Sequence, residues 1–204
     1  MNKPIILDLF AEDLGHEVIV GALVCRLAKE KGFDIHIRIR RARGGHGRVI
    51  SELRLYQDSV LGAIVGLTLP DVLVVAVDAN CKRQAAARRE IEEALDARIK
   101  PLAAIACPDP HIERWCLVDP PSFFDIVGIE PTLPRRKCAK DAYKSLLSDT
   151  VRKAGHVPTL GGIEFAPELI ERMDLYRANK NDKSLKSFVE ELRARLITKA
   201  TSSA

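Results

Sequence analysis

The chain has 204 residues, enough to bury one substantial core and carry a modest appendage, so a second enzyme domain does not fit comfortably. Hydrophobic residues make up 47% of it and charged residues 29%, a globular balance that excludes a disordered chain. The net charge of +4 is mild and permits a nucleic-acid partner without requiring one. No apolar run approaches the roughly 20 residues of a membrane span, so we expect no membrane partner.

The five cysteines are scattered, and no two of them form a C-x-x-C pair. Their number is odd, and no signal-peptide pattern opens the sequence. We therefore expect reduced thiols in a cytoplasmic protein, rather than disulfides or a zinc site.

The first predicted elements are a strand and the helix that follows it. Residues 4–10 form a short apolar run, and Glu12 and Asp13 come directly after it. Apolar residues then recur at helical spacing over residues 15–31, and a glycine ends the pattern. This predicts a strand whose carboxyl end carries acids, followed by a helix that Asp13 caps.

The next segment is strongly basic. Residues 35–40 alternate apolar and basic side chains, which indicates a half-buried edge strand, and a glycine-rich basic loop follows. Arginine suits phosphate oxygens, so this surface is a candidate clamp for a DNA or RNA backbone. The alternative is a solvated edge kept basic against aggregation. The candidate nucleic-acid-binding residues are Arg38, Arg40, Arg41, Arg43 and Arg48.

After a helical pattern over residues 50–64 comes the most hydrophobic stretch of the chain. Six apolar residues, 72–77, run into Asp78, as in a strand buried on both faces of a parallel sheet. Open α/β sheets bind ligands at the carboxyl ends of their strands, so Asp78 is a site candidate, and Asn80 offers a further oxygen ligand. The alternative is that Asp78 caps the helix starting near Lys82.

A third helix over residues 87–95, a fourth strand at 102–107 and a helix at 111–117 complete the alternation. Strands alternating with helices of this length predict right-handed crossovers. The expected fold is therefore α/β, Rossmann-like, with a mostly parallel sheet flanked by helices.

From about residue 120 the character of the sequence changes. Several prolines break the pattern, and only helical signals follow, the last of them with Ser184 as its expected cap. We expect an α/β domain over residues 1–128 and a helical extension, 129–204, packed on it. The expected helices of this extension lie near residues 142–151, 166–173 and 185–196.

Acidic residues follow three of the four predicted strands, where they would converge on one edge of the sheet. Converging carboxylates of this kind bind Mg²⁺ or Mn²⁺ and assist phosphoryl transfer. Taken singly, each acid could equally be a capping or solubilising residue. The acids and the amide concerned are Glu12, Asp13, Asp78, Asn80, Asp109 and Glu113.

Three short motifs carry a family resemblance: AEDLGHE at 11–17, VDANC at 77–81 and PHIERW at 110–115. With the acid after the first strand and the near Asp-x-Asp after the third, they resemble the Toprim domain. They are also similar to an uncharacterised bacterial Toprim-like family related to phage-defence nucleases. The runs at 162–166 and 184–188 are similar to that family's tail.

The resemblance implies a Mg²⁺- or Mn²⁺-dependent nuclease or phosphotransfer enzyme acting on nucleic acid, with a role in phage defence and a companion ATPase. Glu12 would be the general acid or base, Asp78 would hold the metal, and Glu113 would add charge. Asn80 stands where many Toprim domains have a second aspartate, which weakens metal binding. The alternative is therefore a catalytically inactive module that binds nucleic acid or a partner protein on the same fold.

Three other side chains have two interpretations each. Trp115 is expected to anchor the core between the sheet and the C-terminal helices rather than to stack on a base. His16 and His111 could assist at the acidic edge, but a solvent-facing position is as good an interpretation of either.

Overall fold

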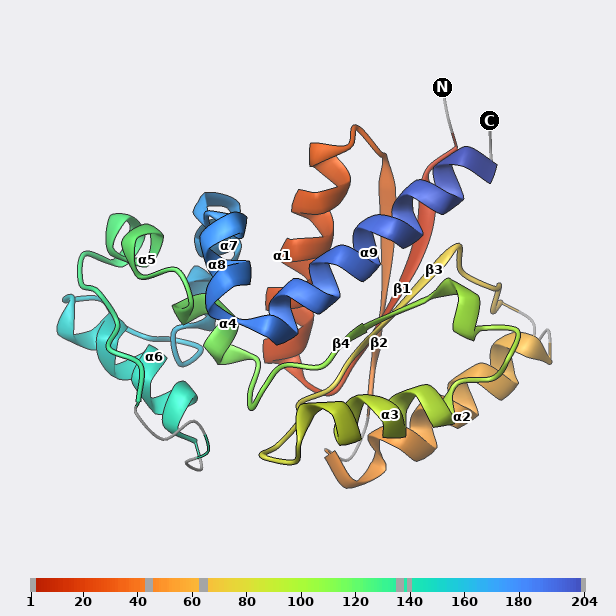
Figure 1. The fold of residues 1–204 in the computed structure, drawn as a ribbon, viewed down its shortest axis with the longest axis horizontal. Helices are drawn as coiled ribbons and strands as arrows, with labels where there is room; N and C mark the ends of the chain where they lie inside the picture. Colours follow the sequence, from red (N-terminus) through yellow and green to blue (C-terminus); the bar gives the residue numbers. More distant parts are fainter. Residues whose placement is uncertain (1–2, 43–45, 63–65, 135–137, 139–140, 203–204) are drawn as a thin grey trace.

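A four-stranded, entirely parallel sheet organises the computed structural model, which describes residues 3–42, 46–62, 66–134, 138 and 141–202 (Figure 1). The strand order is β2-β1-β3-β4, which confirms the predicted α/β class with a parallel sheet. Ala11, Arg41, Ala76 and Ala106 are linked in register, so the carboxyl ends of all four strands are level. The strands are β1 (Ile5–Ala11), β2 (Ile35–Arg41), β3 (Val72–Ala76) and β4 (Ala103–Ala106).

Helices cover both faces of the sheet, as parallel strands require. Figure 1 shows α1 (Leu14–Glu30) and α9 (Lys183–Ser202) on one face, with α2 (His46–Leu61) and α3 (Gln84–Ala94) on the other. Two hydrophobic clusters result, one on each face. All five residues of β3 are buried, as its unbroken apolar run predicts.

Five shorter helices gather at one end of the molecule, on the side of α1 (Figure 1). Their buried residues belong to the same hydrophobic cluster as those of α1 and α9. Within the described ranges, no helix is long and apolar enough to cross a membrane. The five are α4 (Glu113–Leu117), α5 (Pro120–Val127), α6 (Ala142–Lys153), α7 (Ala166–Arg172) and α8 (Leu175–Asn181).

The last helix returns from this end to the sheet. Arg195 donates a hydrogen bond from Nε to the carbonyl of Ala103 (2.8 Å), and Glu191 accepts one from the Ile105 N–H (3.1 Å). Because α9 covers β4 in this way, the end of the chain completes the sheet's own core. The boundary between residues 128 and 129 stays a prediction.

Two local predictions in this half are wrong. The helix α5 is not predicted, because its prolines are interpreted as the end of the regular pattern; Pro120 is instead its first residue, where a missing N–H costs nothing. Asp182, not Ser184, caps α9: its Oδ1 accepts the N–H groups of Ser184 (2.9 Å) and Leu185 (3.0 Å). The Ser184 hydroxyl instead accepts a hydrogen bond from Trp115 Nε1 (3.0 Å), and the predicted role of Trp115 as a buried anchor is confirmed.

The expectation that all cysteines are reduced is also wrong. Cys81, in the turn after β3, forms a disulfide with Cys138, in the segment before α6, and their Cα atoms are 5.5 Å apart. A separation of 57 residues hides this pairing from any spacing pattern. Cys25, Cys107 and Cys116 are free thiols.

The packing of α9 on α4 gives a stability prediction. Phe188 stacks on Trp115 with ring centroids 5.6 Å apart, and both side chains are fully buried. Phe188→Ala should lower the free energy of unfolding by about 3–5 kcal/mol, measured by urea denaturation. The control Tyr176→Ala, at a side chain that is 82% exposed, should change it by less than about 0.5 kcal/mol. A loss below about 1 kcal/mol in Phe188→Ala would contradict the integration of α9 into the core.

Candidate metal centre

Glu12 and Asp78 meet at the carboxyl edge of the sheet, as the sequence predicts. The N–H of Glu12 continues the ladder to the carbonyl of Ala76 (3.0 Å), and that of Val77 bonds Ala106 (2.9 Å). Because β1 and β3 are adjacent and end at the same level, Glu12 and Asp78, which follow them, are neighbours. The backbone N–H of Asp78 donates to Glu12 Oε2 at 3.1 Å.

His16 links this pair to the start of α1. Asp13 is the N-cap of α1, as predicted, and accepts the N–H of His16 (3.1 Å). The same Oδ1 lies 2.8 Å from His16 Nδ1, and His16 Nε2 lies 3.0 Å from Asp78 Oδ1. The side chain of His16 is 0% exposed, so the solvent-facing interpretation is wrong.

The electrostatics of this bridge favour a charged imidazole. Burial disfavours the cation, but the charge of Asp78 and the hydrogen bonds to Asp13 and Asp78 outweigh it and raise the pKa of His16 to about 10. Burial would raise the pKa of both carboxyls, yet His16 lowers it for Asp13 and, together with His111, for Asp78. At neutral pH an imidazolium therefore lies between two carboxylates.

His111 occupies the other oxygen of Asp78. Its Nδ1 lies 3.1 Å from Asp78 Oδ2, and this hydrogen bond raises the pKa of His111 although partial burial opposes it. Two backbone hydrogen bonds position the loop: the N–H of Ala79 donates to Pro108 (2.9 Å) and that of Asn80 to Pro110 (3.1 Å). Asp78 is thus held by two histidines, and α3 begins at Gln84 without a side-chain cap, so the capping interpretation of Asp78 is wrong.

The donor atoms of Glu12, His16 and Asp78 lie within 4.8 Å of one another, close enough to hold one metal ion. Among the described residues, Glu113 and Asp109 do not belong to this group. Asn80 has a left-handed backbone (φ 47°) two residues after Asp78. Its role as a ligand, and that of Glu113, stay predictions.

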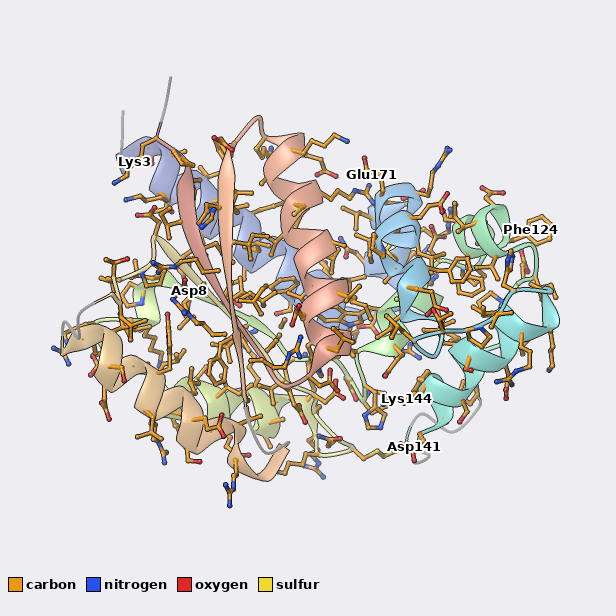
Figure 2. All side chains as sticks on the ribbon, turned by 180° about the vertical axis from the view of Figure 1, so that it is seen from behind. Lys3, Asp8, Phe124, Asp141, Lys144 and Glu171 are labelled. Atoms are coloured by element: carbon orange, nitrogen blue, oxygen red, sulfur yellow. A yellow bond between two sulfur atoms is a disulfide. The ribbon has the colours of Figure 1, made fainter. Side chains whose placement is uncertain are left out.

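Most of the predicted phosphate-binding arginines have acidic partners. Asp8, fully buried in β1, pairs with Arg38 and lies 3.5 Å from Arg40 Nε, and it accepts a hydrogen bond from Tyr56 (2.6 Å) (Figure 2). These arginines therefore neutralise a buried acid beneath α2. Arg41, at the carboxyl edge, pairs with Glu17 on α1, and its side chain remains 51% exposed.

Arg48 is exposed in the first turn of α2, and Arg43 lies outside the described residues. Nucleic-acid binding by these arginines stays a prediction.

The sequence also contained signals for contacts that were not predicted from it. Asp13 and His16, each singled out separately, are three residues apart, which places both at the start of α1. Asp8 is an acid inside an otherwise apolar strand, and a buried acid needs a partner. The alternating arginines of the neighbouring strand supply that partner.

Comparisons of the chain with protein families, with curated proteins and with solved structures found no match. Arguments about function therefore rest on the geometry of this edge.

The raised pKa of His16 predicts a pH-dependent stability. The contribution of His16 is fully present below its ordinary pKa of 6.5 and is lost as the pH rises through about 10. The free energy of unfolding should fall between pH 7 and 9 by at most about 1.4 kcal/mol per pH unit from this group. Urea denaturation of the wild type and His16→Gln would measure it, with a flatter profile in the variant.

Equal slopes in the two proteins would contradict the buried imidazolium. NMR of the wild type measures the pKa of His16 directly and needs no variant. A His16 imidazole that titrates near its ordinary pKa would contradict the buried imidazolium as well.

Proposed function

We propose that this chain is a Mn²⁺- or Mg²⁺-dependent enzyme that cleaves or transfers phosphodiester groups of nucleic acid. The observation that carries the proposal is the group formed by Glu12, His16 and Asp78 at the carboxyl edge of a parallel sheet. Ligands of open α/β sheets bind at this edge, and a divalent cation between two neighbouring carboxylates would balance their charges.

The donor set fits a divalent ion. Glu12 and Asp78 offer hard carboxylate oxygens, and Asp13 bonds Nδ1 of His16, the arrangement that leaves Nε2 of a metal-binding histidine directed at its metal. A nitrogen donor suits Mn²⁺ better than Mg²⁺, because imidazole is the softer ligand. Such an ion, when bound, would polarise a phosphate and lower the pKa of a water molecule.

The side chains of this chain take distinct roles in the proposal. Asp78 and His16 hold the site, and Glu12, which is partly exposed, exchanges a proton with the attacking or leaving oxygen. His111 orients the Asp78 carboxylate through its hydrogen bond to Oδ2.

The proposed partner is the phosphate backbone of DNA or RNA. Arg41 pairs in the sheet with Ala11, the residue before Glu12, and the side chain of Arg41 is half exposed. Arg48, seven residues later in the sequence, is exposed as well. Phosphate contacts of this kind position a strand without reading its sequence. A companion ATPase and a role in phage defence are proposals that rest on the Toprim resemblance alone. A cytoplasmic location is a proposal from the sequence, and the Cys81–Cys138 disulfide removes the reduced thiols from its support.

One observation favours the second candidate, a nucleic-acid or partner-binding module without catalysis. Both oxygens of Asp78 are already hydrogen-bonded to imidazoles, and the charge of His16 balances part of the acidic group without an ion. An ion must then displace the Nε2 proton of His16 to bind there. The two candidates differ in whether a metal binds, which is measurable.

Metal binding should appear as a thermal shift. An ion that binds only the folded state at about 100 times its dissociation constant stabilises it by about 2.7 kcal/mol, so Mn²⁺ should raise the Tm of the wild type by several degrees. Asp78→Asn should abolish the rise, and the control Asp125→Asn, at an exposed acid on α5, should keep it. An equal rise in Asp78→Asn would place the ion elsewhere, and no rise in the wild type would favour the binding module.

Cleavage should depend on Glu12. With Mn²⁺, the purified protein should nick or degrade DNA or RNA, and Glu12→Gln should lower the rate by about 100-fold or more, because glutamine cannot exchange a proton. Gel assays of both proteins and of Glu168→Gln, an exposed control on α7, would measure it. Equal cleavage by wild type and Glu12→Gln would contradict the assignment of Glu12 as the proton-exchanging residue. If none of the three proteins cleaves nucleic acid, the result would favour the binding module.

A further inference from the structure

A cavity of about 280 Å³ adjoins the metal centre on the side of the short helices. It shares Asp13 with the bridge to His16, so it opens next to the same edge of the sheet. This volume is near the lower end of the range of small-molecule sites. The lining residues are Asp13, Leu14, Gly15, Glu113, Lys144, Leu160, Gly161 and Ile163.

Glu113 is the buried acid of this cavity. The residue is 7% exposed, and its Oε1 lies 4.0 Å from where a Cβ on Gly15 would stand, in the cavity lining. Burial raises the pKa of this carboxyl group and the nearby charge of Asp78 adds to the effect, although a hydrogen bond from the Glu113 backbone N–H opposes it. Among the described residues, that N–H is the donor which the carboxyl group has within the protein. A carboxylate has about four lone-pair sites on its two oxygens, so this group can also accept the N–H groups of a ligand in the cavity.

The rest of the lining has a different chemistry. Leu14, Leu160 and Ile163 supply apolar surface, and Lys144 is an exposed cation in the first turn of α6 (Figure 2). The charge of Lys144 acts on Glu113, because it lowers that pKa against the effect of burial. The cavity therefore combines a buried acceptor, apolar surface and an exposed cation.

Hydrogen bonds to Glu164 fix the loop at residues 159–162, which forms the outer part of the cavity. The carboxylate of Glu164 accepts the N–H groups of Thr159 (2.7 Å), Leu160 (3.1 Å) and Gly162 (2.9 Å). Gly162 has φ 93° and packs so closely on α6 that a Cβ there would lie 2.8 Å from Leu147 Cγ. The cavity is therefore preformed, as binding sites for small groups usually are.

We propose that this cavity binds one unpaired nucleotide of the nucleic-acid substrate, with Glu113 accepting the N–H groups of its base and Lys144 attracting its phosphate. This inference rests on the proposed function. Guanine presents two adjacent N–H donors on its pairing edge, whereas the N–H of uracil or thymine is flanked by carbonyl oxygens that a carboxylate repels. A base enclosed here cannot remain paired, so the substrate is a single strand or an opened end.

The binding experiment uses single nucleotides in the presence of EDTA, which separates it from the metal centre. By calorimetry, wild-type protein should bind guanosine 5′-monophosphate about tenfold more tightly than uridine 5′-monophosphate, the discrimination of one good paired contact. Glu113→Gln should remove this preference, and Lys144→Met should weaken both nucleotides alike. Glu168→Gln should behave as the wild type.

A second variant tests the cavity independently, in case Glu113→Gln does not fold. Leu160 is 51% exposed at the rim, so Leu160→Trp should fold and should block guanosine 5′-monophosphate by filling the cavity. Unchanged affinity in Leu160→Trp, or an equal affinity of the wild type for both nucleotides, would overturn the inference.

The failures of the two proposals are distinguishable. Cleavage with Mn²⁺ that depends on Glu12 but shows no preference among nucleotides would overturn the nucleotide cavity and leave the metal-dependent function standing. Binding of guanosine 5′-monophosphate that depends on Glu113, without any Mn²⁺-dependent cleavage, would support the cavity and overturn the enzyme. Cleavage of duplex DNA as fast as single strands would also overturn the unpaired-nucleotide requirement.

Discussion

The arrangement at the carboxyl edge depends on the buried imidazole of His16, held between Asp13 and Asp78. A buried charge is tolerated only with partners of opposite sign, and removing either carboxylate would leave one ring nitrogen of the cation without its counter-charge. The bridge therefore joins the first turn of α1 to the loop after β3. The same contacts orient Asp78 beside Glu12, so the interaction that holds this edge together also shapes the candidate metal centre.

The loops around this centre are tied to the helical end of the molecule. Backbone hydrogen bonds join the loop after β3 to the loop after β4, and the Cys81–Cys138 disulfide joins the former to the segment before α6. The helices α4 and α6 then contribute Glu113 and Lys144 to a cavity beside the candidate metal centre. The helical end and the sheet share one hydrophobic cluster, which fixes the two sides of this cavity relative to each other.

Some of the charged residues of this chain stabilise the fold and are therefore not available to bind a ligand. Asp8 has no contact with water inside β1, and the arginines of β2 and the hydroxyl of Tyr56 surround it. Arg38 and Arg40 are thus committed to a structural ion pair, which leaves Arg41 and Arg48 as the more accessible cations. A basic stretch in a sequence marks a binding surface only as far as its charges are not already neutralised by the fold.

The sequence alone determined the fold class and the proximity of Glu12 and Asp78, because hydrophobic periodicity is local and level parallel strands end at one edge. It could not place His16, whose burial depends on two carboxylates from different segments, nor join Cys81 to Cys138 across 57 residues. It also predicted Glu113 as a ligand, which stays a prediction, but it did not place that residue in the lining of the neighbouring cavity. Only tertiary packing decided these three features, the burial of His16, the disulfide and the position of Glu113. The direction and the pairing of side chains depend on contacts between segments that are distant in the chain.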